Sequence, residues 1–244
     1  MVPRSDNRDV DCAYCRFVSG RIVTRTLYSG TRNASSWAFR AWLALKEADV
    51  PFEEVVVDIR IPQRLANLAK IAEFSPPGAV PVLVDDDTVI YDSLAIMEYA
   101  NELSGGRLLP ADLKARAHAR SLAAWQHAGL SGLCPRLSFE SSFYPDRRSM
   151  SDDEIAESGK IFDVWEQELS QSNGPYLLGE ISLADLCFVP SVLRLTSHMV
   201  SLDRWPLCLA WTRALFGRPA VKEWLAEANT LPPVRLDGYR DQRV

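Results

Sequence analysis

Residues 80–96 read Val-Pro-Val-Leu-Val-Asp-Asp-Asp-Thr-Val-Ile-Tyr-Asp-Ser-Leu-Ala-Ile, and they indicate how the surrounding chain is arranged. Two β-branched runs flank the acidic turn at 85–87, which predicts a β-hairpin. Pro81 stands at the start of the first strand, where it donates no ladder hydrogen bond. Asp92 and Ser93 end the second strand and precede an apolar helical pattern, so they are suited to cap a helix. The free N–H groups and the dipole of such a helix start also favour an anion.

The elements around this hairpin predict a small α/β domain. Strand-like segments at 24–29 and 52–59 flank a helical pattern at 36–48, and this unit implies a parallel strand pair with a right-handed crossover. A weaker helix is expected at 62–73 and another at 93–104. The order β-α-β-α-β-β-α is typical of a layered domain with a mixed sheet.

The second part of the chain is predicted to be all-helical. Its helical patterns are separated by Pro, Gly and Ser, and they lie at 112–136, 152–172, 182–198, 203–215 and 218–229. Ser182 and Asp185 form a capping-box pattern, to which we assign a structural role. The predicted division is an N-terminal extension (1–23), an α/β domain (24–106), a linker (107–111) and an all-helical domain (112–244).

Composition argues against several classes of function. The 244 residues carry a net charge of −5 without a basic stripe, which argues against nucleic acid, and no apolar run is long enough to span a membrane. The N-terminus lacks the apolar segment of a signal peptide and the five cysteines are scattered, so a reduced, cytoplasmic location is expected. No residue cluster has metal-ligand spacing. Cys12 and Cys15 form a lone C-x-x-C in the extension, which we interpret as incidental rather than as a redox or zinc motif.

Three motifs, taken in order, resemble the cytosolic glutathione transferases. Val80 and Pro81 match the cis-proline turn of that family, Asp-Ser-Leu-Ala-Ile at 92–96 matches its acidic-Ser-x-Ala-Ile signature, and 182–185 matches the capping motif of its helical domain. The start of the first helix, Ser-Ser-Trp-Ala-Phe-Arg-Ala-Trp, is similar to bacterial serine-type members close to the zeta class. This resemblance covers roughly residues 24–230. It implies a thioredoxin-like N-terminal domain, glutathione as co-substrate, no metal, and a homodimer.

The resemblance also implies where glutathione binds. Ser93 and the helix N–H groups would take the carboxylate of the γ-glutamyl group, while Asp92 would pair with its ammonium. Val80, which precedes the cis-proline Pro81, would offer its backbone N–H and C=O to the cysteinyl part. These four residues, together with Asn33 at the start of the first helix, are therefore the predicted glutathione site.

Catalysis in this family requires the thiolate of glutathione, because a free thiol is mostly protonated at neutral pH. Counting back from the end of the first helix places the catalytic serine of zeta-like members at Ser35, followed by Ser36. An alignment anchored on Trp37 places Asn33 at that position instead. A hydroxyl donates to a thiolate at short range, which favours Ser35, although both serines are also suited to cap the helix.

The second substrate would lie between the domains. The resemblance places it against the helix that carries His127 and Cys134, near Trp37, where aromatic and aliphatic groups suit a small apolar electrophile. The expected activity is attack of the glutathione thiol on that electrophile. Two alternatives remain open, a glutathione-dependent isomerase of the maleylacetoacetate type and a non-catalytic binding module with the same fold.

The cations of the sequence depart from the family pattern. Many members hold the glycyl carboxylate of glutathione with a cation just before the cis-proline turn, but residues 77–79 carry no charge. Arg64 or Gln63 is left to reach that carboxylate. Arg40 and Arg32 lie near the predicted site, yet the sequence shows no arginine cluster of the kind that would grip a dicarboxylate.

Overall fold

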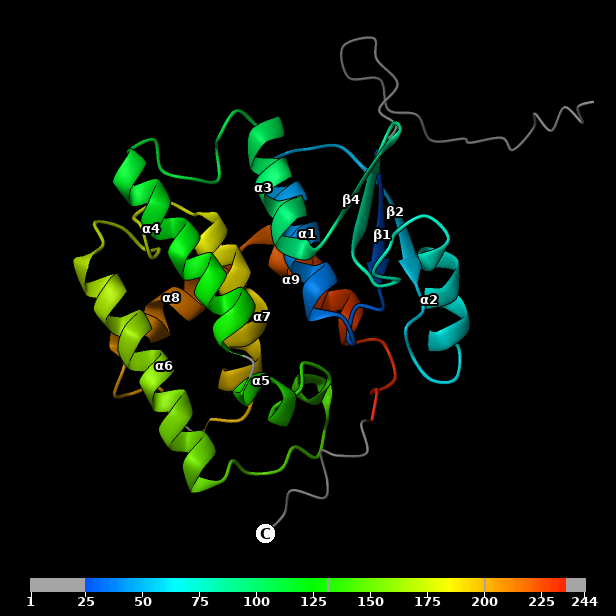
Figure 1. The fold of residues 1–244 in the computed structure, drawn as a ribbon. Coiled ribbons are helices and arrows are strands. Elements are labelled where there is room, and N and C mark those ends of the chain that lie inside the picture. Colours follow the sequence, from blue (N-terminus) through cyan, green and yellow to red (C-terminus); the bar gives the residue numbers. More distant parts are fainter. Residues whose placement is uncertain (1–24, 131, 200, 236–244) are drawn as a thin grey trace, which may run out of the picture.

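The computed structural model describes residues 25–130, 132–199 and 201–235, and the predicted extension with Cys12 and Cys15 lies outside them. In the described part, a β-α-β-α-β-β-α domain is followed by a domain of helices (Figure 1). The prediction of a thioredoxin-like domain joined to an all-helical one is confirmed.

The N-terminal domain is built on a four-stranded mixed sheet in the order β2-β1-β3-β4. β1 (Thr26–Gly30) runs parallel to β2 (Glu53–Val57) and antiparallel to β3 (Val82–Asp85), which pairs with β4 (Thr88–Tyr91). The parallel pair and the hairpin are both as predicted. Asp86 closes the hairpin with a φ of 54°, a conformation that Asp adopts more readily than most residues.

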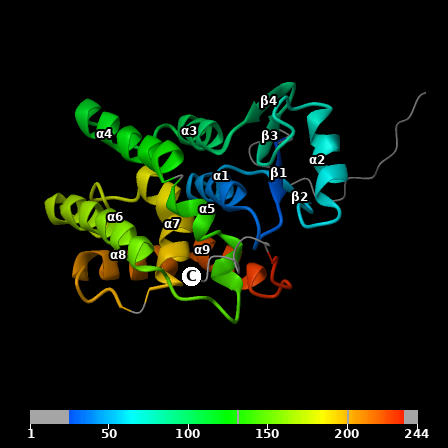
Figure 2. The ribbon, with the colours of Figure 1, turned by 60° about the horizontal axis from the view of Figure 1, so that its bottom comes forward.

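Helices cover both faces of this sheet. α1 (Ser36–Glu47) and α3 (Ser93–Leu103) lie on the face toward the helical domain, and α2 (Arg64–Ala72) lies on the other face (Figures 1 and 2). α1 also packs against α7 (Leu183–Thr196) and α9 (Pro219–Ala228) of the helical domain. Since nine of the twelve residues of α1 are buried, both domains fix its position.

The helical domain departs from the prediction at its first helix. The sequence predicts one helix over 112–136, whereas α4 (Leu113–Ala124) passes into a π-helical turn, η1 (Trp125–Gly129), before the short α5 (Leu133–Arg136). Two glycines and a proline between 129 and 135 disfavour a continuous helix, because glycine is a poor helix former and proline lacks an N–H. π-Turns of this kind are frequent at functional sites.

The remaining predicted helices are present with small shifts at their ends. They are α6 (Asp152–Gln171), α7, α8 (Pro206–Gly217) and α9, with a 3-10 turn η2 (Glu140–Phe143) before α6. The carboxylate of the buried Asp185 accepts hydrogen bonds from the N–H and hydroxyl of Ser182, so the capping prediction is confirmed.

Candidate functional site

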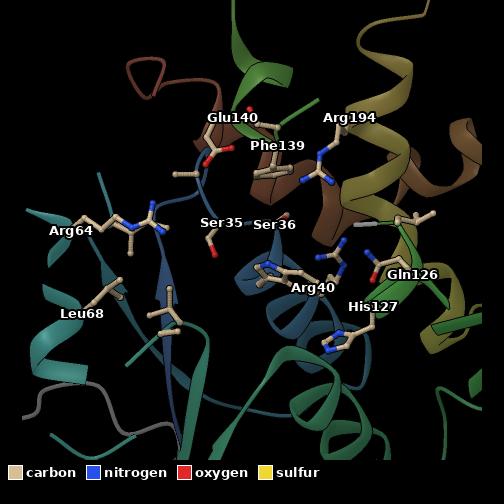
Figure 3. Close-up of a pocket in the computed structure, with 17 residues that line it drawn as sticks. Ser35, Ser36, Arg40, Arg64, Leu68, Gln126, His127, Phe139, Glu140 and Arg194 are labelled. Atoms are coloured by element: carbon tan, nitrogen blue, oxygen red, sulfur yellow. The ribbon is translucent and has the colours of Figure 1, made fainter. Parts of the chain in front are cut away.

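Two adjoining hollows lie where the N-terminus of α1 meets the helical domain. The larger has a volume of about 600 Å³ and the smaller about 300 Å³. Trp37, Val80 and His127 line both of them, so the two hollows form one cleft. Figure 3 shows side chains from both domains converging on the larger hollow.

The smaller hollow gathers four of the five residues predicted to hold glutathione, all except Asn33. Val80, Pro81, Asp92 and Ser93 all line it, and the Val80–Pro81 bond is cis, as predicted. The Ser93 side chain is only 2% exposed, and its hydroxyl oxygen has no hydrogen-bond partner. A buried polar group left unpaired costs about 1–3 kcal/mol. Ser93 therefore offers an unused hydrogen-bonding group to a ligand in this hollow.

Asp92 caps the helix that begins beside it. Its backbone has a φ of 76°, and its Oδ1 accepts hydrogen bonds from the N–H groups of Leu94 (2.8 Å) and Ala95 (3.4 Å). Its second oxygen, Oδ2, lies 3.3 Å from Nε2 of His127. Helix capping thus uses one oxygen of the carboxylate and leaves the other facing the helical domain.

His127 lies at the boundary between the two hollows. The π-turn η1 carries it, and its ring meets the edge of the Trp37 ring at a centroid distance of 5.1 Å. Trp37 is 41% exposed and lines both hollows. The structure therefore places these two residues beside the predicted glutathione site as well as beside the predicted second-substrate pocket.

Ser35 stands at the junction of the cleft and α1. It is the N-cap of α1, and its hydroxyl oxygen accepts a hydrogen bond from the N–H of Ala38 at 3.1 Å. A Cβ atom placed on Gly30 would lie 3.0 Å from both Ser35 Oγ and Val80 Cγ2, so these two side chains lie close to the same point of β1. The Ser35 hydroxyl proton has no acceptor within the described part of the chain, and it can be donated to a ligand.

The other candidates for the thiol contact are placed differently. Ser36 is buried at the first position of α1 and lines the larger hollow. Asn33 lines neither hollow, and its side-chain amide donates to the backbone carbonyl of Pro232 at 3.0 Å. Cys134 belongs to α5, but its side chain lies outside the described residues.

Three arginines line the larger hollow. Arg40 comes from α1, Arg64 from α2 and Arg194 from α7 (Figure 3). Arg32, noted in the sequence, lies outside this lining and forms ion pairs with Glu54 and Glu227 instead.

Arg194 was not predicted from the sequence. It is the one basic residue of α7, a helix whose other residues in this stretch are mainly apolar and buried on every side. A charged residue in such a helix is the signal that could have identified it, because a buried charge needs a partner or a ligand.

The rest of the larger hollow combines apolar walls with one acid. Ile59, Leu68, Leu130 and Phe139 supply apolar surface. Glu140 also lines it, and burial raises the pKa of this carboxyl group, opposed in part by hydrogen bonds and by nearby arginines. Such a cavity suits a small apolar molecule that carries a polar or charged group.

Two further chemical features are relevant. Among the described residues, no group of three or more His, Cys, Asp or Glu side chains is arranged to hold a metal ion. None of the helices described has both the length and the apolar character needed to cross a bilayer.

Comparison with known proteins agrees with this architecture. The family model of the glutathione S-transferase N-terminal domain matches residues 34–103, and that of the C-terminal domain matches residues 143–228. The glutathione S-transferase-like protein OpS6 of Beauveria bassiana is 30% identical over 218 residues, which cover 84% of this chain and 96% of that protein. The maleylacetoacetate isomerase of Mus musculus is 32% identical over 182 residues, covering 74% and 82%.

A solved structure gives the same result at the level of the fold. The glutathione transferase homologue from Burkholderia, solved with bound glutathione, superposes with a TM-score of 0.63 at 23% identity and covers 86% of this chain and all of its own. One family model matches the N-terminal domain and the other the helical domain, and each relative aligns over about three quarters of this chain or more. The chain belongs to the glutathione S-transferase family.

Proposed function

We propose that this protein is a glutathione transferase of the serine type, in which the smaller hollow binds glutathione and the larger one binds an electrophile. The observation that carries this proposal is the unpartnered hydroxyl of Ser93, 2% exposed beside Asp92 at the N-terminus of α3. The Ser93 hydroxyl, the free N–H groups of the helix and the helix dipole all favour a carboxylate. The γ-glutamyl end of glutathione supplies that carboxylate.

With the γ-glutamyl carboxylate placed at Ser93, the other parts of glutathione can be assigned to neighbouring residues. The ammonium beside the γ-glutamyl carboxylate pairs with Oδ2 of Asp92, the oxygen that helix capping leaves available. The backbone of Val80, before the cis bond, pairs with the cysteinyl part, as a strand would. Arg64 lines the larger hollow and is the cation we assign to the glycyl carboxylate.

Ser35 would then act on the thiol. Its hydroxyl donates a hydrogen bond to the sulfur and thereby stabilises the thiolate, the reactive form. The thiolate attacks an electrophilic carbon of the second substrate, a carbon–sulfur bond forms, and the leaving group departs with the bonding electron pair. Ser35 touches the reacting atom and is therefore the proposed catalytic residue.

Calorimetric titration with glutathione tests the binding step. Ser93→Ala should weaken binding by roughly ten- to a hundredfold, because a hydrogen bond to a charged group is lost. Ser104→Ala, at the far end of the same helix, is the matched control and should bind as the wild type does. A wild-type protein that fails to bind millimolar glutathione would overturn the proposal.

An isomerase is the second candidate, because one relative at 32% identity is a maleylacetoacetate isomerase. In an isomerisation, glutathione adds to the substrate and leaves again, so free thiol is not consumed. In a transfer reaction it is consumed one for one. Assaying free thiol during turnover separates the two. Binding without any turnover, unaffected by Ser35→Ala, would instead favour a binding module.

We also propose that the chain is a homodimer in the cytoplasm, as the family pattern suggests. Size-exclusion chromatography with light scattering tests the first part. A mass of about one chain, near 27.3 kDa, would contradict it.

A further inference from the structure

Arg194 is a buried cation that faces the larger hollow. Its residue is 5% exposed and its Nε has no hydrogen-bond partner, while its charge acts on the carboxyl group of Glu140, which lines the same hollow. It comes from α7 and points toward Phe139 at the wall of the hollow (Figure 3). Its position in the site is therefore not explained by packing between helices.

The free-energy cost of burying a charge makes the position of Arg194 an indication of its ligand. A guanidinium stays protonated at any physiological pH. Removing such a charge from water without an anionic partner is unfavourable by several kcal/mol even after the protein relaxes. A side chain held this way inside a ligand cavity is stabilised when an anion enters that cavity. Since guanidinium and carboxylate match in a planar, two-point geometry, a carboxylate is the best partner.

The other charged side chains around the larger hollow also favour an anionic ligand. Arg40 lines the same hollow. Its Nε donates a hydrogen bond to the carbonyl of Cys187 at 2.7 Å, which holds its charge beside the N-terminal half of α7. Arg64 lines this hollow as well, but the proposed function assigns it to the glycyl carboxylate of glutathione. The one acid in the lining, Glu140, has its pKa raised by burial, and the charge of Arg194 acts on it in the opposite direction, so three guanidinium groups face a single carboxyl group. His127 lies on the far side and contacts Asp92. The hollow is therefore cationic on the side of α7.

We propose that the electrophile accepted by this protein carries an anionic group, a carboxylate, which Arg194 binds while the apolar body of the electrophile packs on Leu130 and Phe139. This inference rests on the proposed transferase function and names its substrate class. The carboxylate itself does not react. The thiolate of glutathione forms the new bond to carbon, and the leaving group departs as an anion.

Two matched compounds test the inference. One is an ortho-nitro aryl chloride with a carboxylate para to the chlorine, and the other is the same compound with a neutral carboxamide. In both, the carbon–sulfur bond forms and chloride leaves. The ratio of kcat/KM for the carboxylate to that for the carboxamide is measured in the wild type and in Arg194→Gln. Comparing the two ratios cancels the intrinsic reactivity of each compound.

Arg194→Gln should lower this ratio by roughly tenfold or more, since a charge-assisted hydrogen bond to the carboxylate is lost. Arg213→Gln, an exposed arginine on α8, is the control and should leave the ratio unchanged. Titration of both variants with glutathione checks that the smaller hollow is intact. If Arg194→Gln does not fold, Arg194→Lys keeps the charge but not the planar fork and should give an intermediate ratio.

Distinct outcomes overturn the two proposals. An equal ratio in the wild type and in the folded Arg194 variant, with both compounds turned over, would overturn the carboxylate inference and leave the transferase function standing. A wild-type protein that binds glutathione and turns over only the carboxamide would overturn it as well. Failure to bind glutathione at all would overturn the proposed function from which the inference starts.

Discussion

Replacing Ser35 with alanine should raise the pKa of the glutathione thiol bound to the protein. In the proposed mechanism the Ser35 hydroxyl favours the charged form of the sulfur, so its removal should make the thiolate less stable and move ionisation to higher pH. A hydrogen bond to a charged group contributes about 1.5–3 kcal/mol, and one pKa unit corresponds to about 1.36 kcal/mol. The thiol pKa should therefore rise by roughly one to two units.

The pH dependence of kcat/KM with a neutral aryl chloride measures this shift. At neutral pH the variant should react roughly ten to a hundred times more slowly, and it should approach the wild-type rate at alkaline pH, where the thiol ionises without help. Ultraviolet absorbance of the bound thiolate gives the same pKa without turnover. Both measurements should agree.

Stability changes in the same variant through a separate contact. Ser35 also caps α1 by accepting the N–H of Ala38, and losing an N-cap costs about 0.5–2 kcal/mol in the free energy of unfolding. Thermal unfolding measures that cost. Ser36→Ala is the control, because Ser36 lines the same hollow but caps no helix. An unchanged thiol pKa in Ser35→Ala, or an equal shift in Ser36→Ala, would refute the assignment.

Two further substitutions test the geometry of the cleft. Gly30→Ala would place a Cβ 2.7 Å from that of Ser35, so we expect up to about a hundredfold lower kcat/KM and a loss of about 1–3 kcal/mol in thermal stability. Gly217→Ala, whose Cβ meets nothing within 4 Å at the end of α8, should leave kcat/KM unchanged and raise the stability by about 0.4–1 kcal/mol. His127→Ala should weaken glutathione binding by a factor of about 1.5–5 in calorimetry, because Asp92 loses a partially exposed partner. An unchanged affinity would show that this contact does not orient Asp92.

The residues of the smaller hollow, the proposed glutathione half of the cleft, could be brought together from the sequence because their placement depends on local rules. A strand, a turn with Pro81 and the cap residues Asp92 and Ser93 follow one another along a short stretch, and each has its own sequence preference. The structure places all three together in the smaller hollow, with Val80–Pro81 in the cis form. Consecutive residues cannot be far apart, so correct local structure was enough.

The electrophile half could not be predicted in the same way. Its members come from α1, α2, η1 and α7, and only the packing of the two domains brings them together. The periodicity of 112–136 favoured a continuous helix, and it gave no sign that a π-turn would direct His127 at Asp92. Arg194 similarly fits a helical pattern, and only its burial beside the cleft indicates a role.

The two halves of the cleft should therefore respond differently to substitution. Residues of the helical domain, such as Arg194 and Leu130, line only the larger hollow, and changes there should alter the choice of electrophile while glutathione affinity stays constant. His127 is the exception, because it belongs to the helical domain yet contacts Asp92 and lines both hollows. Under the proposed function, it therefore connects the position of the helical domain to the binding of glutathione by Asp92. A shift of η1 relative to α3 would then change the binding of glutathione and of the electrophile together. A substitution on the α7 side of the cleft should change only the binding of the electrophile.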